Sequence, residues 1–162
     1  MVPVYLGLGS NVDPEENLRL GIRELRRTFG EIELSAIYSN AAIGFDGADF
    51  LNMVVRLQSR DSPRAIQGQA ESIHVLAGRD RSYDQYSSRP LDIDLLLYGD
   101  ELIDEPDLKL PRCDVLDYSF VLRPLAELDP GLMHPRTGKT MAEHWQAFDA
   151  SRHPLRLVDI IL

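Results

Sequence analysis

The sequence contains a single cysteine, Cys113, among its 162 residues. One cysteine cannot build a disulfide framework or a cysteine-based zinc site. The four histidines, at positions 74, 134, 144 and 153, do not suggest a metal site either, because they are not spaced as metal ligands relative to one another. The sequence therefore predicts neither a disulfide-stapled domain nor a Cys/His zinc site.

Long apolar runs and an excess of positive charge are also missing. None of the apolar runs approaches the roughly eighteen residues that a membrane-spanning helix needs, and Met1-Val2-Pro3 lacks the basic start of a signal peptide. Lys and Arg total 17 against 26 Asp and Glu, so the formal net charge is −9. This balance argues against nucleic acid or an anionic membrane surface as a partner. We therefore expect a cytoplasmic protein that is monomeric or at most weakly dimeric. An anionic substrate would need a locally basic pocket or a metal.

The sequence does contain enough apolar material for a sizeable core. Hydrophobic residues make up 44% and charged residues 27% of the chain, and no repeat, low-complexity tract or linker is visible, so we expect one domain over residues 1–162. Periodicity predicts strands at 2–8, 32–38, 50–57 and 89–98, helices at 14–29, 63–76, 120–128 and 141–148, and an edge strand at 155–162. The order strand-helix-strand, repeated once, predicts an α+β fold. This is a ferredoxin-like split β-α-β sheet with helices packed on it and further helices at the C-terminal end.

Gly7 and Gly9 stand at the end of the first predicted strand. They could be mistaken for a phosphate-binding loop, but the third glycine of a dinucleotide fingerprint and a following Gly-Lys-Ser/Thr are missing. We therefore predict that the two glycines form a tight turn from the strand into the first helix.

Residues 89–98 carry the most informative pattern in the chain. Apolar residues alternate with Asp92 and Asp94, which predicts a strand with both carboxylates on one face and Leu91, Ile93, Leu95 and Leu97 on the other. Two neighbouring carboxylates on one face repel each other, so a positive group is expected between them. Mg²⁺ suits such a pair, because it is typically held by one or two carboxylates together with substrate phosphates. A half-buried strand with a solvated acidic face would give the same pattern, since a bare D-x-D is a weak motif.

The polar segment before this strand is rich in arginine. Arg79, Arg81 and Arg89 precede the acidic pair, and Arg89 at the mouth of the strand could reach a phosphate oxygen. The alternative is a solvated face that neutralises part of an acidic protein. A second loop, residues 39–49, is long enough to be functional rather than a simple connection.

Six short motifs occur in a fixed order along the chain: Leu6-Gly-Leu-Gly-Ser-Asn11, Asp49-Phe50-Leu51-Asn52, Gly78-Arg79-x-Arg81, Leu91-Asp92-Ile93-Asp94 after Arg89, Phe120-Val121-Leu122-x-Pro124-Leu125, and His134-Pro135-x-x-Gly138-x-Thr140. In this order and spacing they resemble the 6-hydroxymethyl-7,8-dihydropterin pyrophosphokinase family of folate biosynthesis. Members of that family transfer the pyrophosphoryl group of ATP to the hydroxymethyl oxygen of the pterin and release AMP, using two Mg²⁺ ions. The resemblance implies the same small-molecule substrates, ATP and a dihydropterin, for this chain.

The resemblance also implies a role for each matching position. Asp92 and Asp94 would hold both metals and act in catalysis together with Arg79 and Arg89. The pterin would be bound by the backbone of Asn40, Ala41, Ala42, Ile43 and Gly44 and by the side chains of Phe50, Asn52 and Phe120, with Phe120 stacked on the ring. The ATP side would comprise Glu71, His74, Arg79, Arg81, Arg89, Arg112 and Tyr118. From the residues alone, Phe50 and Phe120 could equally be core, and Asn52 could cap a turn.

The sequence departs from the family pattern mainly on the ATP side. His74 replaces the usual glutamate, Ser87-Ser88 replaces a Gly-Pro-like pair, Arg112-Cys113 follows Pro111 in place of histidine and then proline or tyrosine, and Tyr118 replaces an arginine. The alternative function is therefore a pterin-binding paralogue with weak or altered phosphotransfer activity. A D-x-D nucleotidyltransferase ranks lower, because its Gly-Ser pair should lie shortly before the acidic strand, whereas Gly9-Ser10 lies far upstream.

Overall fold

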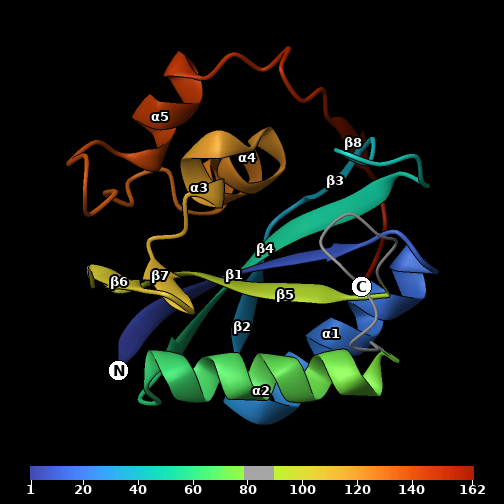
Figure 1. Cartoon of the computed structure of the whole chain (residues 1–162), viewed down its shortest axis with the longest axis horizontal. Helices are drawn as coiled ribbons and strands as arrows, with labels where there is room; N and C mark the ends of the chain where they lie inside the picture. The colour runs from blue at the N-terminus through green and yellow to red at the C-terminus, as the bar shows by residue number, and fades with distance from the viewer. Residues whose placement is uncertain (79–89) are drawn as a thin grey trace.

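The computed structural model describes residues 1–78 and 90–162, in which an antiparallel sheet separates two groups of helices. In Figure 1 one group lies below the sheet and the other above it. The lower group is α1 (Pro14–Phe29) and α2 (Pro63–Leu76), and the upper group is α3 (Asp114–Asp117), α4 (Ser119–Leu128) and α5 (Met141–Ala147). In the described parts of the chain no helix combines the length and apolar character needed to cross a membrane.

The main sheet has the strand order β5-β1-β4-β3-β8, and β2 also pairs with β4. The strands are β1 (Val2–Ser10), β2 (Ile32–Leu34), β3 (Ile37–Asn40), β4 (Phe50–Ser59), β5 (Asp92–Tyr98) and β8 (Arg156–Val158). The order β5-β1-β4 followed by β2 and β3, with all pairings antiparallel, is that of a split β-α-β sheet. The predicted α+β, ferredoxin-like fold is therefore confirmed. β8 adds to the edge through β3 and is shorter than the predicted strand at 155–162.

Each face of the sheet has its own apolar core. The core under α1 and α2 includes Leu6 and Leu8 of β1 with Leu18 and Ile22 of α1. The core under α4 and α5 includes Tyr5, Val54, Leu96, Leu122 and Leu125. Alternate residues of the same strands supply the two cores, as the pleat of a strand requires. A small hairpin, β6 (Ile103–Glu105) and β7 (Leu108–Leu110), connects β5 to α3.

The predicted single strand at 32–38 is two strands with a bulge between them. Leu34 pairs with Val55 and Tyr38 pairs with Asn52, so four steps along β2 and β3 face three steps along β4. An extra residue reverses the direction in which the following side chains point. Ile37 therefore enters the core under α1 and α2, and the Tyr38 hydroxyl on the opposite face donates a hydrogen bond to Glu127 of α4. The prediction of an uninterrupted strand is wrong at this point.

A second bulge interrupts β5. Tyr5 pairs with Leu97, but the next residue of β1, Leu6, pairs with Leu95, which leaves Leu96 as the extra residue. Leu97 consequently joins Leu96 in the core under α4, so the prediction that it shares a face with Leu95 is wrong. The carbonyl of Leu96 accepts a hydrogen bond from the backbone N–H of Arg112 at 3.0 Å. This bond places Arg112 beside the acidic half of β5.

Candidate active site

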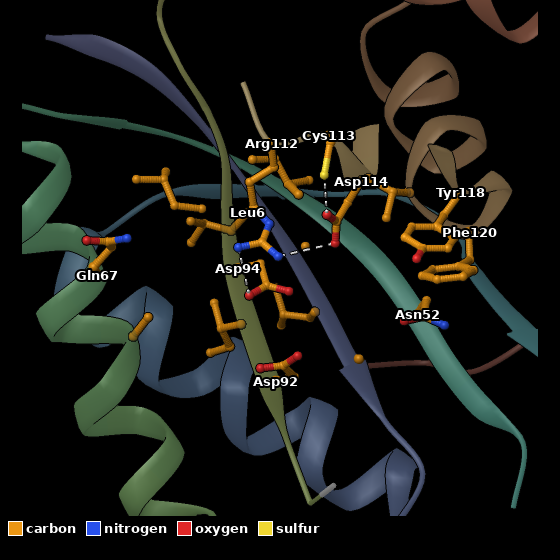
Figure 2. Close-up of a pocket in the computed structure, with 18 of the residues that line it drawn as sticks. Leu6, Asn52, Gln67, Asp92, Asp94, Arg112, Cys113, Asp114, Tyr118 and Phe120 are labelled. Carbon is orange, nitrogen blue, oxygen red and sulfur yellow. Dashed lines mark hydrogen bonds and ion pairs between the residues drawn. The ribbon is translucent and has the colours of Figure 1, made fainter. Parts of the chain in front are cut away.

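The predicted acidic pair lies on the face of the sheet that α4 covers. Ile93 and Leu95 belong to the core under α1 and α2, so the alternating Asp92 and Asp94 point to the opposite face, as predicted. Both line a cavity of about 810 Å³ that extends over β1 and β4 to α4. Figure 2 shows the two carboxylates one above the other along β5.

Two glycines form the floor of this cavity in the neighbouring strand. In the sheet register Gly9 pairs with Asp92 on one side and Asn52 on the other, while Gly7 pairs with Asp94 and Val54. Both glycines lie within β1, so the predicted role in a strand-to-helix turn is wrong. Because they carry no side chain, the middle of the floor between the carboxylates and Asn52 stays open.

Gly9 has a further, specific constraint. A Cβ atom at this position would lie 2.6 Å from Oδ1 of Asn52, which is closer than real Cβ contacts allow. Gly7 is less restricted, because a Cβ there would lie 3.4 Å from the nearest atom, the Cδ1 of Leu96. The carboxamide of Asn52 thus packs into space that exists only because residue 9 is glycine.

The far side of the cavity combines amide and aromatic side chains. Asn52 is buried, and its Nδ2 donates to Oδ1 of Asn40 at 2.5 Å, which fixes the orientation of the carboxamide. Phe50 and Phe120 also line the cavity, the first from β4 and the second from α4. The bulge between β2 and β3 sets the register that brings Asn40 to this face. Of the predicted segment 40–44, Asn40 and Ile43 are lining residues, and Ala41, Ala42 and Gly44 are not.

Tyr118, predicted on the ATP side, lies against the residue predicted to stack on the pterin. Its ring stacks on Phe120 with a centroid distance of 5.0 Å and an interplanar angle of 19°. In the view of Figure 2, Tyr118 and Asn52 are on opposite sides of the Phe120 ring. His153 adds a third ring 5.4 Å from Tyr118, and its carbonyl accepts a hydrogen bond from the Ser119 hydroxyl at 2.5 Å. In this view the Tyr118 ring therefore supports Phe120 on the side away from Asn52.

His74 is held at the edge of β5, where its Nε2 lies 4.0 Å from Oδ1 of Asp92. Its side chain is buried, and its Nε2 accepts a hydrogen bond from the backbone N–H of Ile93 at 2.7 Å. A neutral ring that accepts at Nε2 carries its proton on Nδ1, which lies 3.1 Å from Oε2 of Glu71. Glu71 and His74, both predicted on the ATP side, line the cavity next to Asp92. The Ile93 contact secures the strand that presents Asp92 and Asp94.

Arg112, also predicted on the ATP side, lies between two carboxylates. Its Nη1 is 3.8 Å from Oδ1 of Asp94, and its Nη2 is 3.3 Å from Oδ2 of Asp114 (Figure 2). Burial alone would lower the pKa of Arg112. The attraction by the Asp94 and Asp114 carboxylates is stronger in sum, so the pKa of Arg112 is raised. The predicted phosphate-binding residues Arg79, Arg81 and Arg89 lie outside the described residues.

The sequence prediction missed several polar residues that line the cavity: Gln67, Lys109 and Asp114. Gln67 donates from Nε2 to the carbonyl of Asp107 at 3.2 Å, which joins α2 to the turn between β6 and β7. None of the three stands in a motif, so no local signal marks them. Gly7 and Gly9 did carry a signal, because a glycine inside a strand often marks close approach of a ligand or a neighbouring group.

The chemistry of the acidic pair fits Mg²⁺ bound together with phosphates. The described residues contain no cluster of three or more His, Cys, Asp or Glu side chains that could hold a metal. Asp92 and Asp94 would therefore supply two carboxylates, and phosphate oxygens and water would complete the octahedral shell that Mg²⁺ prefers.

The fold and the cavity define a ferredoxin-like α+β protein that pairs an acidic, phosphate-compatible end with an amide and aromatic end. The sequence assigns the chain to a narrower group within that class. The chain belongs to the 7,8-dihydro-6-hydroxymethylpterin-pyrophosphokinase family, whose sequence model matches residues 5–130. This membership confirms the resemblance seen in the six motifs.

Relatives in several organisms support the assignment. A 2-amino-4-hydroxy-6-hydroxymethyldihydropteridine pyrophosphokinase of Aquifex aeolicus is 34% identical over 145 residues, which cover 88% of this chain and 90% of the relative. The enzyme of the same name from Haemophilus influenzae is 30% identical over 141 residues, covering 85% of this chain and 88% of the relative.

The fold recurs in a solved structure. The Plasmodium falciparum HPPK-DHPS A437G protein with pteroate superposes with a TM-score of 0.71 at 12% identity, over 90% of this chain. This chain spans 43% of the length of that protein. At this level of identity the likeness concerns the fold alone.

Proposed function

We propose that this chain transfers the pyrophosphoryl group of ATP to the hydroxymethyl group of 6-hydroxymethyl-7,8-dihydropterin, releasing AMP, as a step of folate biosynthesis. Family membership and the names of the relatives support this function. The observation that carries it is the row formed by Asp92, Gly9 and Asn52 across three strands. The row has a carboxylate at one end of an open floor and an amide at the other, which supports metal-bound phosphates on the first side and a heterocycle on the second.

The acidic end would position the phosphates. Two Mg²⁺ ions held by Asp92 and Asp94 would supply charge neutralisation for the transferred pyrophosphoryl group. The hydrogen bond from Ile93 to His74 keeps the strand edge between the two carboxylates in place. Arg79, Arg81 and Arg89 are predicted to donate to phosphate oxygens, as guanidinium groups do well. Catalysis would then rest on positioning and on charge stabilisation, without a dedicated general base.

The amide end would select the pterin. A carboxamide can both donate to and accept from the edge of a heterocycle, and the bond to Asn40 holds Asn52 in one orientation. Phe50 and Phe120 line the same cavity as this amide and offer faces for the flat ring. Further contacts would come from the backbone of residues 40–44.

The direct test is analysis of the nucleotide product. Wild-type protein incubated with ATP, Mg²⁺ and 6-hydroxymethyl-7,8-dihydropterin should form AMP, and omission of either the pterin or Mg²⁺ should stop its formation. Formation of ADP, or no turnover by a folded sample, would contradict the proposal. Pterin binding by fluorescence without any binding of a non-hydrolysable ATP analogue would also contradict it.

The stack behind Phe120 makes a separate prediction about pterin affinity. Tyr118→Ala should weaken pterin binding by about threefold to tenfold, because an aromatic pair contributes roughly 0.5–1.5 kcal/mol beyond its buried area. Tyr118→Phe keeps the ring and should bind pterin as the wild type does. Fluorescence titration with pterin and calorimetry with an ATP analogue would measure both affinities. If Tyr118→Phe instead weakens analogue binding and leaves pterin binding unchanged, the hydroxyl of Tyr118 serves the nucleotide.

A further inference from the structure

We propose that Arg112 is a resident counterion of the acidic pair, which neutralises Asp94 in the metal-free protein and makes metal binding depend on nucleotide. The inference rests on the proposed function, because it takes Asp92 and Asp94 to be the metal-binding residues. It adds a residue that controls when the metal binds. In the loaded protein the guanidinium would leave Asp94 and donate to a phosphate oxygen.

The backbone holds Arg112 where its side chain can reach the pair. Its N–H bonds to the carbonyl of Leu96, the bulge residue two positions after Asp94. From there the guanidinium extends into the cavity between Asp94 and Asp114, as Figure 2 shows. The bulge in β5 therefore determines that a cation sits over the carboxylate of Asp94.

The N–H groups of this guanidinium make few good hydrogen bonds in this position. Its Nη1 lies 3.8 Å from Oδ1 of Asp94, which is an ion pair but too long for a hydrogen bond. The contact to Asp114 at 3.3 Å is a weak hydrogen bond, and the buried Nε has no hydrogen-bond partner among the described residues. An arginine has five N–H donors in a planar fork that matches phosphate oxygens. A phosphate placed near Asp94 would thus give this group better partners than it has now.

A metal and this guanidinium compete for the same carboxylate. A cation bound to Asp94 would lie within a few ångströms of the positive charge of Arg112, and like charges at this distance repel. The described residues offer no third ligand in a cluster with Asp92 and Asp94, so these side chains alone would hold a metal weakly. Nucleotide phosphates would relieve both problems, because they bring oxygen ligands for the metal and acceptors for Arg112.

Mn²⁺ is a suitable probe, because free Mn²⁺ can be measured directly by electron paramagnetic resonance without any turnover. In the absence of nucleotide, Arg112→Gln should bind Mn²⁺ about tenfold more tightly than the wild type, a shift of about 1.4 kcal/mol. With a non-hydrolysable ATP analogue present, this difference should disappear or reverse. The enhancement of Mn²⁺ affinity by the analogue should therefore shrink at least about tenfold in Arg112→Gln.

Two further variants separate local from general effects. Arg19→Gln removes the same charge from an exposed ion pair with Glu15 on α1, so its Mn²⁺ affinity should match the wild type. Arg112→His introduces the residue usual at this position in the family. Measured at about pH 8, where an ordinary imidazole is uncharged, it should tighten Mn²⁺ binding as Arg112→Gln does. It also keeps the test decisive if Arg112→Gln fails to fold.

The outcomes distinguish this inference from the proposed function. If neither neutral variant tightens Mn²⁺ binding, but Asp92→Asn abolishes it, the counterion role is overturned and the metal site stands. If Asp92→Asn leaves Mn²⁺ binding unchanged, the acidic pair is not the metal site, and both the inference and the metal part of the proposed function fall. Equal tightening in Arg19→Gln would also overturn the inference, since net charge alone would then explain the effect.

Discussion

Asp92→Asn is expected to remove most of the turnover while leaving the metal-free protein as stable as the wild type, or slightly more stable. Asparagine keeps the size of the side chain but removes one negative charge and with it a carboxylate that we propose binds metal. A loss of at least about 10²–10³-fold is expected, the range seen when one preorganised charge-stabilising group is removed from an active site. Stability should not fall, because repulsion with Asp94 is relieved and functional sites trade stability for chemistry. AMP formation and unfolding by urea in the absence of metal measure the two effects.

Asp94→Asn is the matched control, since it removes the other carboxylate and with it the ion pair to Arg112. Turnover should fall as far as in Asp92→Asn. Metal-free stability should instead decrease by at most about 1 kcal/mol, because the pair of Asp94 with Arg112 is partly exposed and screened by solvent. If the two residues were merely solvated, both variants would keep their activity and stay within about 0.5 kcal/mol of the wild type. Wild-type turnover in Asp92→Asn would remove the two-metal assignment altogether.

The sheet and the acidic face were predictable because they depend on local periodicity. Alternation around Ile93 and Leu95 places Asp92 and Asp94 on one face whatever the strand pairs with. Two strand-helix-strand units in succession leave few ways to bury their apolar faces, and the split β-α-β sheet is one of them.

The bulges were not predictable from the same periodicity. An extra residue in β2–β3 or β5 leaves the apolar pattern nearly unchanged but moves Tyr38 and Leu97 to the other face. Both bulges bear on the site. One directs Asn40 toward Asn52, and the other places Arg112 over Asp94. Both contacts depend on strand register, and the register cannot be predicted from the apolar pattern of any one strand.

The contacts made by the residues that depart from the family pattern are also seen only in the structure. His74 was predicted on the ATP side in place of a glutamate, and in the structure its ring accepts a hydrogen bond from the backbone N–H of Ile93 and thereby supports the acidic strand. Tyr118 appeared as a lost arginine, yet it stacks behind Phe120. The resemblance to the family implies that such positions differ, but the partner of each side chain depends on the neighbours that folding brings together.

Gly9→Ala is expected to weaken pterin binding by more than about tenfold, although it adds only a single uncharged methyl group. Its Cβ would lie 2.6 Å from Oδ1 of Asn52, and the bond between Asn52 and Asn40 prevents the carboxamide from yielding easily. Either the amide moves out of its recognition position or the strands separate locally. Overpacking of this kind typically destabilises a protein by about 1–3 kcal/mol. Fluorescence titration with pterin and urea unfolding would measure both effects.

Gly7→Ala and the double variant Gly9→Ala/Asn52→Ala show whether Asn52 is the cause. Gly7 faces the same cavity, but its added Cβ meets the flexible end of Leu96 at 3.4 Å, so pterin affinity should change less than about threefold and stability by about 0.5 kcal/mol or less. Asn52→Ala alone should lose pterin affinity, and adding Gly9→Ala to it should cost little more, because the clash is gone. Additive losses in the double variant, or normal pterin binding by Gly9→Ala, would mean that the glycine does not act through the carboxamide of Asn52.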